Sequence, residues 1–315
     1  MDPTNRLSPV LRGRLEFFAD MGRFVSWRAG GKADRLYTPA DLEDLAAFMQ
    51  TLPPLEPVQF IGLGSNLLIR DGGLRGTVVH LHAALRQLHI EQRRQRSWAD
   101  LDLDHYGLIY AEAGVASPKL ASYAALNNLT GAEFLAGIPG TVGGALAMNA
   151  GCHGAETWSS VRQVLTLDRQ GMQYRRLPGD FRIGYRLCEP ATSREEWFVA
   201  AWFAFPRGDG EASRARIKEL LDKRIATQPL NLPNCGSVFR NPPDLHAARL
   251  IQDCGLKGLT IGGAQVSDKH ANFIVNLGGA TAADIETLIE TVQAKVETAT
   301  GIRLEREVRI IGEHA

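Results

Sequence analysis

The chain has 315 residues, of which 44% are hydrophobic and 22% charged, the balance of an ordinary globular protein with two or three domains. Lysine plus arginine equals aspartate plus glutamate at 35 each, so the net charge is zero. This balance gives no support for nucleic-acid or membrane-surface binding as the main role. The first 22 residues are too charged for a signal peptide, and no run approaches the roughly 18 apolar residues of a membrane span.

The four cysteines form no Cys-x-x-Cys pair and have no histidine at metal-ligand spacing beside them. We therefore expect reduced thiols in a cytoplasmic protein and no metal site. No apolar stripe demands a partner, so we expect a monomer.

Helix and strand patterns alternate along the first half of the chain. Apolar residues at 42, 45, 48 and 49 mark one face of a helix. Short β-prone runs predict strands at 58–62, 67–69, 77–81 and 108–114. The last of these leads into a helix over 118–126. The polar segment 85–106, which includes the arginines between Arg86 and Arg96, is interpreted as an extended surface hairpin.

The second half begins with a strand and turn over 158–167 and an aromatic β-prone run over 197–205. Two amphipathic helices are predicted over 212–227 and 284–298. The first is expected to present one face made of Ile217, Leu220, Leu221 and Ile225. The second has Thr281 as its N-cap and Gly301 as its C-cap. A final strand is predicted through 307–311.

Two breaks in this pattern suggest three parts. The clearest boundary is the linker Pro206-Arg-Gly-Asp-Gly210, and a weaker one lies near 81–84. We expect an α+β architecture with subdomains at 1–83 and 84–210 and a C-terminal domain at 211–315, whose last strand returns to the active site.

Gly62-Leu-Gly64 follows a predicted strand but is not a dinucleotide-binding fingerprint. The third glycine position holds Leu67, and the residues after it are strand-like rather than helical. What remains is a strand–turn–strand unit with Ser65 and Asn66 in the turn. Successive N–H groups in such a turn can form an anion-binding nest, to which both side chains can add donors.

The run 137–151 has five glycines and few large side chains. Ordering such a segment costs conformational entropy, so we expect a ligand or another backbone to approach it closely. Ligand contact is favoured over a close-packed crossing of two elements.

Together, Gly62-Leu-Gly-Ser-Asn-Leu-Leu-Ile69 and Gly137-Ile-Pro-Gly-Thr-Val-Gly-Gly144 resemble the FAD-binding domain of the vanillyl-alcohol-oxidase (PCMH) type. The resemblance is closer still to the UDP-N-acetylenolpyruvoylglucosamine reductase family. It covers nearly the whole chain, and its motifs occur in the family's order: Phe24-Val-Ser-Trp-Arg-Ala-Gly-Gly31, Asp180-Phe-Arg-Ile-Gly-Tyr-Arg186, Asn234-Cys-Gly-Ser-Val-Phe-Arg-Asn-Pro242, Ala271-Asn-Phe-Ile-Val-Asn276 and Glu307-Val-Arg-Ile-Ile-Gly312.

This resemblance implies non-covalent FAD and a C-terminal α+β substrate domain. It implies that NADPH reduces FAD, and that hydride then passes to C3 of UDP-N-acetylglucosamine enolpyruvate, giving UDP-N-acetylmuramate for peptidoglycan synthesis. The residues that would contact FAD are Gly62, Gly64, Ser65, Asn66, Leu67, Gly114, Gly137, Ile138, Gly140, Thr141, Gly143, Gly144, Ala145, Asn149 and Gly151.

The same resemblance assigns three catalytic residues. Arg186 would be an electrophile for the substrate carboxylate, which a guanidinium matches by bidentate geometry. Ser237 would donate the proton to C2. Glu307 would hydrogen-bond the developing carboxylate charge if it is protonated. Strand alternation places Glu305 and Glu307 on one face, so only the family pattern selects Glu307.

Asn241 and His270 occupy the family's substrate-contact positions. Cys188 replaces a Ser or Thr that is common in the family, which removes any hydroxyl role there. The short stretch between Arg186 and Ser237 contains no tyrosine and resembles the type that lacks an inserted loop over the substrate.

Two other readings stay open. One is an FAD oxidoreductase of the same fold with another substrate, in which Cys152 or His153 could hold the flavin covalently. The other is a UDP-sugar-binding or scaffold protein without activity.

Overall fold

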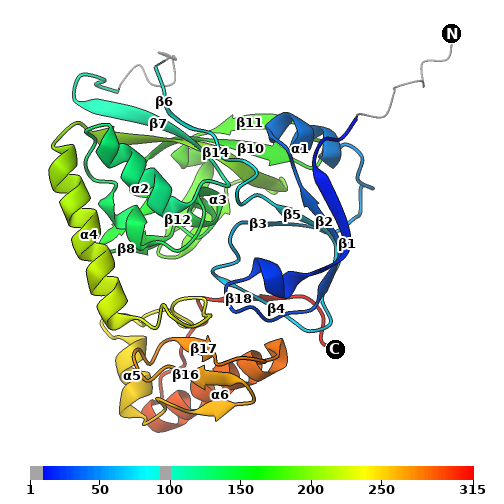
Figure 1. Ribbon diagram of the computed structural model, residues 1–315, viewed down its shortest axis with the longest axis vertical. Helices are drawn as coiled ribbons and strands as arrows, with labels where there is room; N and C mark the ends of the chain where they lie inside the picture. Colours follow the sequence, from blue (N-terminus) through cyan, green and yellow to red (C-terminus); the bar gives the residue numbers. More distant parts are fainter. Residues whose placement is uncertain (1–9, 93–100) are drawn as a thin grey trace.

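The computed structural model describes residues 10–92 and 101–315. Figure 1 shows three bodies: an N-terminal sheet, a larger sheet covered by helices, and a C-terminal body below both. The N-terminal sheet has the order β1-β2-β5-β3 and is flanked by α1 (Leu42–Met49). Its strands are β1 (Arg14–Asp20), β2 (Lys32–Thr38), β5 (Leu74–His80) and β3 (Val58–Ile61). β1 is antiparallel to β2, whereas β2, β5 and β3 are parallel.

The larger sheet is antiparallel and has the order β11-β10-β14-β7-β6. Its strands are β11 (Gln173–Arg176), β10 (Val161–Asp168), β14 (Glu196–Pro206), β7 (Tyr106–Glu112) and β6 (Leu88–Ile90). Side chains of α2 (Ser117–Leu126) and α3 (Val142–Ala147) share a core with this sheet. Two small hairpins form sheets of their own: β8 (Gly151–Cys152) with β9 (Ala155–Glu156), and β12 (Phe181–Gly184) with β13 (Leu187–Pro190).

The helix α4 (Gly210–Thr227) leads from the larger sheet to the C-terminal body (Figure 1). It packs on α2 and on the 3-10 helix η3 (Glu133–Gly137), and Ile217 belongs to the core of the larger sheet. The C-terminal body consists of α5 (Ala247–Asp253), α6 (Ala282–Thr300), β15 (Thr260–Ile261), β16 (Ala264–Val266) and β17 (Ile274–Asn276). The proposed boundaries at 83 and 210 stay predictions.

The final strand leaves the C-terminal body and returns to the N-terminal one. β18 (Arg309–Ile311) pairs in parallel with β4 (Leu67–Ile69), with Arg309 opposite Leu67. Because β4 directly follows the turn 62–66, this pairing carries the C-terminal residues to the first glycine motif.

Most helices and strands expected from the sequence are confirmed. Thr281 accepts a hydrogen bond from the Asp284 N–H at the start of α6, and Gly301 ends that helix in the left-handed conformation. Ile225 is wrong as a member of the buried face of α4, because its side chain is 59% exposed. It lies two turns beyond Ile217, past the residues that pack into the core of the larger sheet.

The hairpin expected over 85–106 is longer than predicted: β6 pairs antiparallel with residues 109–111 of β7, so its second strand lies beyond the expected range. Its residues 93–100 lie outside the described residues. Within the described ranges, no helix is both long and apolar enough to cross a membrane. The same ranges hold no group of three or more His, Cys, Asp or Glu side chains arranged to bind a metal.

Candidate active site

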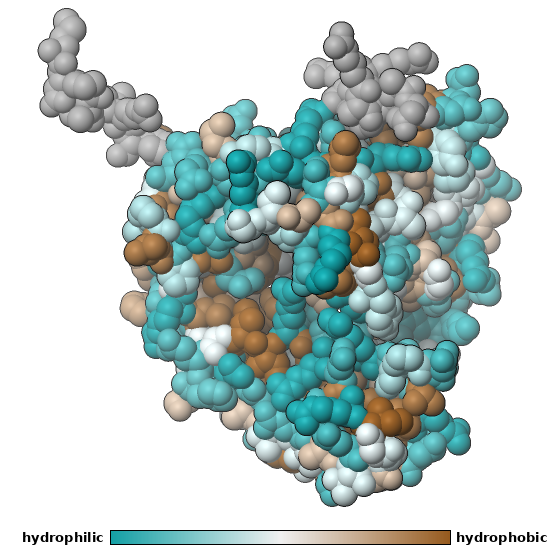
Figure 2. Space-filling model, turned by 180° about the vertical axis from the view of Figure 1, so that it is seen from behind, coloured by the Kyte–Doolittle hydropathy of each residue, from teal (hydrophilic) through white to brown (hydrophobic). Residues whose placement is uncertain are grey.

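The two glycine-rich segments meet face to face. A Cβ added to Gly62 would lie 2.2 Å from the Thr141 Oγ1, and one added to Gly140 would lie 3.1 Å from the Ser65 Oγ. The missing side chains therefore let the turn 62–66 and the run 137–151 approach each other. A cavity of about 330 Å³ lies along both segments, and the surface seen from behind is hollowed near its middle, where hydrophobic side chains gather (Figure 2).

Most of the predicted FAD contacts line this cavity. They are Gly62, Gly64, Ser65, Asn66, Leu67, Gly137, Ile138, Gly140, Thr141, Gly144, Ala145 and Gly151. The cavity wall is therefore made largely of backbone and small side chains, with hydroxyl and amide groups from Ser65, Asn66 and Thr141. Such a wall suits a ligand that is both bulky and phosphorylated, because N–H groups and short donors can reach its oxygens.

Three predicted FAD contacts do not line the cavity. A Cβ on Gly114 would lie 1.9 Å from the Leu81 carbonyl oxygen, and one on Gly143 would lie 2.9 Å from the Ala113 Cβ. Both glycines allow close packing behind the cavity wall. Asn149 is buried, and its amide donates to the Glu156 carboxylate and the Gly184 carbonyl. These residues shape the wall from behind, and direct contact with the flavin stays a prediction.

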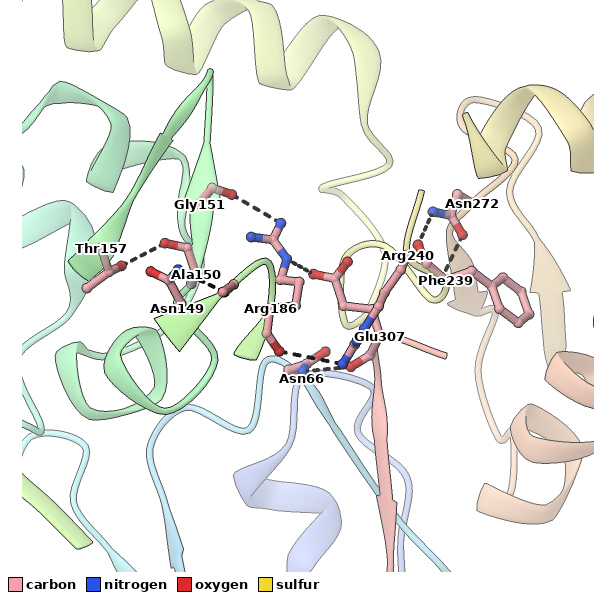
Figure 3. A network of polar contacts seen from close by, with 11 residues as sticks. Asn66, Asn149, Ala150, Gly151, Thr157, Arg186, Phe239, Arg240, Asn272 and Glu307 are labelled. Carbon is pink, nitrogen blue, oxygen red and sulfur yellow. Dashed lines mark hydrogen bonds and ion pairs between the residues drawn. The ribbon is translucent and has the colours of Figure 1, made fainter. Parts of the chain in front are cut away.

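Arg186 reaches the cavity from the tip of the β12–β13 hairpin. Gly184 pairs with Leu187, so Tyr185 and Arg186 form a two-residue loop, and Arg186 has a φ of +52°. Its Nε donates to the Glu307 Oε1 at 2.6 Å, and its Nη2 donates to the Gly151 carbonyl at 3.2 Å (Figure 3). The guanidinium carbon also lies 5.2 Å from the Tyr185 ring centroid, a cation–π contact.

Glu307 is placed by backbone pairing on both sides. Its carbonyl accepts from the Asn66 side chain at 3.1 Å, next to the β4–β18 pair. On the other side its N–H donates to the Val238 carbonyl at 2.8 Å, and the Val308 N–H approaches the same oxygen at 3.3 Å. Two N–H groups on one carbonyl indicate a bulge at residues 307–308, directly before β18.

This arrangement separates the two candidate glutamates. The Glu307 side chain is 15% exposed and lines the cavity, whereas the Glu305 side chain is 77% exposed and lies 3.7 Å from the Arg240 Nη1. Burial raises the pKa of Glu307 above its ordinary value, although the charges of Arg186 and Arg240 oppose that shift. Burial therefore favours the protonated form of Glu307.

Ser237 lies in the wall of the same cavity as Arg186 and Glu307. It directly precedes the segment 238–240 that pairs with residues 305–307, through the bridge between Phe239 and Arg306. The three predicted catalytic residues therefore come together, although they are separated by 51 and 70 positions in the sequence.

Asn241 and His270 do not line either of the two cavities found near the glycine-rich segments. The Asn241 side chain accepts from the Ala247 N–H at the start of α5, and the His270 Nδ1 accepts from the Asn272 N–H. Burial lowers the pKa of His270, so its ring is neutral at pH 7. Their predicted substrate contacts stay predictions.

Cys188 packs against the hydrophobic core of the larger sheet, and burial raises its pKa to about 12. The thiol therefore fills space there, and it does not act as an acid at neutral pH. Cys152 lines the cavity, but burial also raises its pKa, which disfavours the thiolate that covalent attachment of a flavin would need.

Sequence reasoning missed two cationic residues of the cavity, Arg224 and Arg309. Arg309 could have been found from its position two residues after Glu307, but Arg224 lies in the last turn of α4 without a motif. Arg224 also lines a second cavity of about 990 Å³ that the N-terminal loop 20–30 and the segment 230–236 border. Ser65, Pro139 and Gly236 line both cavities as well, so the two are adjacent.

Comparison with known proteins agrees with this geometry. A family model described as an FAD-binding domain matches residues 33–175, and one described as the UDP-N-acetylenolpyruvoylglucosamine reductase C-terminal domain matches residues 228–311. A UDP-N-acetylenolpyruvoylglucosamine reductase of Thiobacillus denitrificans is 59% identical and covers 97% of this chain and 94% of its own length. The chain belongs to this reductase family.

Further members of the reductase family are also similar to this chain over nearly its full length. The reductase of Nitrosospira multiformis is 55% identical over 96% of this chain and 90% of its own. The crystal structure of the reductase from Thermus caldophilus superposes with a TM-score of 0.74 at 30% identity, covering 96% of this chain and 99% of that one. The expected α+β fold, with an FAD-binding domain followed by the reductase C-terminal domain, is confirmed, and FAD is the cofactor.

Gly62 offers a direct test of the FAD site in this reductase. Gly62→Ala places a methyl group against the Thr141 Oγ1 and must separate the two glycine-rich segments. We expect FAD affinity to fall at least about tenfold, which corresponds to about 1.4 kcal/mol, measured by titrating apoprotein with FAD. Gly179→Ala is the matched control, because nothing lies within 4 Å of its added Cβ. Equal affinities for both variants would contradict the assignment.

Proposed function

We propose that this chain reduces UDP-N-acetylglucosamine enolpyruvate to UDP-N-acetylmuramate with NADPH, in peptidoglycan precursor synthesis. The observation that carries the proposal is the convergence of Arg186, Ser237 and Glu307 on the cavity that both glycine-rich segments line. FAD supplies hydride transfer when it is bound along Gly62–Leu67 and Gly137–Gly151.

Arg186 acts as the carboxylate receptor. Its guanidinium keeps its charge, and it can form two parallel hydrogen bonds to the enolpyruvyl carboxylate, where negative charge develops during reduction. In the present structure its Nε is bound to Glu307. Substrate binding therefore exchanges one carboxylate partner of Arg186 for another.

Glu307 can give up its ion pair with Arg186 because it can take up a proton. A protonated Glu307 can donate a hydrogen bond to the developing carboxylate charge instead of repelling it. The burial that raises its pKa favours that neutral form, and the approach of a second carboxylate favours it further.

Ser237 donates the proton to C2. A serine hydroxyl is a weak acid, but the acceptor is a reactive carbanion, and nearby guanidinium groups stabilise the alkoxide.

The 990 Å³ cavity beside the site suits the UDP part of an elongated substrate. Arg224, which borders both cavities, suits its diphosphate. We also propose that the protein is a cytoplasmic monomer, and that NADPH and the UDP-sugar occupy one site in turn.

Anaerobic stopped-flow tests the proposed reaction. The purified flavoprotein is mixed first with NADPH and then with UDP-N-acetylglucosamine enolpyruvate, while flavin absorbance is followed. We expect bleaching in the first mix and recovery in the second, and NADH in place of NADPH measures the preference between nucleotides. Recovery with oxygen but not with the enolpyruvyl substrate would reject the proposal.

The flavin is expected to be released when the protein is denatured. Cys152 is the nearest thiol to the glycine-rich run 137–151, and burial raises its pKa, which favours the protonated thiol. Acid precipitation followed by spectrophotometry of pellet and supernatant should find the flavin in the supernatant. Yellow colour retained by the polypeptide would instead establish a covalent bond.

A further inference from the structure

Arg240 lies close to Arg186, and its charge acts on Glu307 (Figure 3). Its N–H donates to the Glu305 carbonyl at 2.9 Å, within the pairing of 238–240 with 305–307. From there the side chain turns back, and its Nη2 lies 3.5 Å from the Arg186 carbonyl oxygen (Figure 3). Its Nη1 lies 3.7 Å from the Glu305 Oε2. Its Nε is buried without a hydrogen-bond partner among the described residues.

Arg186 needs such support because its backbone is in an unfavourable conformation. A residue with a side chain at a φ of +52° costs on the order of 1 kcal/mol, so surrounding contacts must hold it there. Its side chain contacts Glu307 and Gly151, and the Glu307 contact must loosen when a substrate carboxylate takes its place. The hydrogen bond from the Arg240 side chain goes to the backbone carbonyl of Arg186. It can therefore persist while the Arg186 side chain changes its carboxylate partner.

A second cation near Glu307 affects how readily this carboxyl group takes up the proton that the exchange requires. It is the only carboxylate among the described residues that line the cavity, and its side chain is 15% exposed. A buried carboxylate that loses its partner is strongly destabilised. The other charged or titratable groups of this cavity are Arg224 from α4, Arg309 from β18, and the thiols of Cys152 and Cys235.

Arg240 is the cation beyond Arg186 whose charge lowers the pKa of Glu307. Glu305 competes for it, since the two form an exposed ion pair. The backbone pairing of residues 240 and 305 fixes this triad of Glu305, Arg240 and Glu307 within one short segment.

We propose that Arg240 is a positioning residue: it holds the Arg186 backbone when the Arg186 side chain turns to the substrate, and its charge, which Glu305 attenuates, limits how readily Glu307 takes up a proton. This inference rests on the proposed function for the identity of the substrate, but the charge relation within the triad does not depend on it.

The sign of each substitution follows from electrostatics. A neighbouring cation stabilises the ionised carboxylate, so Arg240→Gln moves the titration of Glu307 to higher pH. Glu305→Gln removes the competing anion and moves it to lower pH. Arg240→Lys keeps the charge and restores most of the wild-type value. A merely structural role for Arg240 would not produce opposite shifts in two neighbouring variants.

The titration is measured on oxidised holoenzyme without substrate, by difference infrared spectroscopy of the carboxyl band, with Glu307→Gln as the blank that assigns the signal. We expect a midpoint about one pH unit higher in Arg240→Gln and a smaller decrease in Glu305→Gln. Arg249→Gln is the matched control, since it removes an exposed arginine that pairs with Asp253 on α5. Midpoints unchanged in both triad variants would overturn the proposal.

A second measurement follows the binding of UDP-N-acetylglucosamine enolpyruvate to the same proteins, through the perturbation of flavin absorbance. Binding should weaken above the Glu307 midpoint, and the pH at which it weakens should shift in the same direction as the infrared midpoint. If wild type does not bind this substrate, the proposed function fails while the infrared series still tests the triad. Should Arg240→Gln not fold, the exposed Glu305→Gln variant decides the outcome alone.

Discussion

Ser237→Ala is expected to leave the reduction of the flavin by NADPH nearly intact and to slow its reoxidation by the enolpyruvyl substrate about 10²–10⁴-fold, the usual cost of losing a general acid. The side chain lines the cavity beside Arg186 and Glu307 but belongs to neither glycine-rich segment. Removing its hydroxyl should therefore affect proton delivery without disturbing FAD. Anaerobic stopped-flow measures the two half-reactions separately.

Two comparisons make the Ser237 test specific. Ser193→Ala changes an exposed serine in the β13–β14 connection and should keep both rates. Reoxidation of Ser237→Ala in deuterium oxide should show a solvent isotope effect different from wild type, because another group or water must deliver the proton. Equal slowing of both half-reactions would exclude Ser237 as the proton donor.

Arg186→Ala is expected to slow reoxidation by the substrate about 10²–10³-fold, the range for losing one electrostatic stabiliser of a developing anion. Alanine and arginine have similar backbone preferences, so the left-handed conformation at this position is strained to a similar degree in both proteins. The loss should therefore report the guanidinium and not a collapsed hairpin. NADPH reduction should be largely retained.

The same substitution changes the titration of Glu307. Burial raises the pKa of Glu307, and with Arg186 absent mainly the charge of Arg240 opposes this effect. The pKa of Glu307 therefore rises further, and the protonated form persists to higher pH. The rate of reoxidation in Arg186→Ala should therefore stay flat to a higher pH than in wild type, although its plateau is lower. A pH profile of the second half-reaction checks this.

Arg182 provides the matched control for Arg186. It lies on the same hairpin, but its side chain is 71% exposed and pairs with Glu189 on the neighbouring strand. Arg182→Ala should keep both half-reactions close to wild type. If it slows reoxidation as much as Arg186→Ala does, the effect belongs to the hairpin and the proposed role of Arg186 is rejected.

Glutamates 305 and 307 show where sequence reasoning reached its limit. Alternation along an extended strand places both on one face. In the structure residues 305–307 do not form a regular strand, because only Arg306 bridges to Phe239 and β18 begins at Arg309. Simple alternation therefore does not apply: Glu307 lines the cavity, whereas Glu305 stays at the surface. This local geometry depends on residues 238–240, which are too far away in the sequence for any local pattern to report it.

The FAD contacts show a similar division. The family resemblance placed 62–69 and 137–151 together around FAD, and in the structure both segments line one cavity. Positions without side chains are needed where two backbones and a ligand approach. The resemblance could not separate Gly62, which faces Thr141 in the cavity, from Gly114, which packs against Leu81 behind it. The two glycines look alike in a sequence, because only the structure shows which atoms an added side chain would contact.

The sequence by itself determined the secondary structure, the glycine-rich segments and the order of motifs that marks the reductase family. These are encoded locally, in apolar spacing, turn residues and helix caps such as Thr281 and Gly301. Only the tertiary structure decided which residues meet at the cavity. The parallel pairing of β18 with β4 and the approach of Arg224, Arg240 and Arg309 depend on backbone hydrogen bonds and burial between distant segments, which no local pattern records.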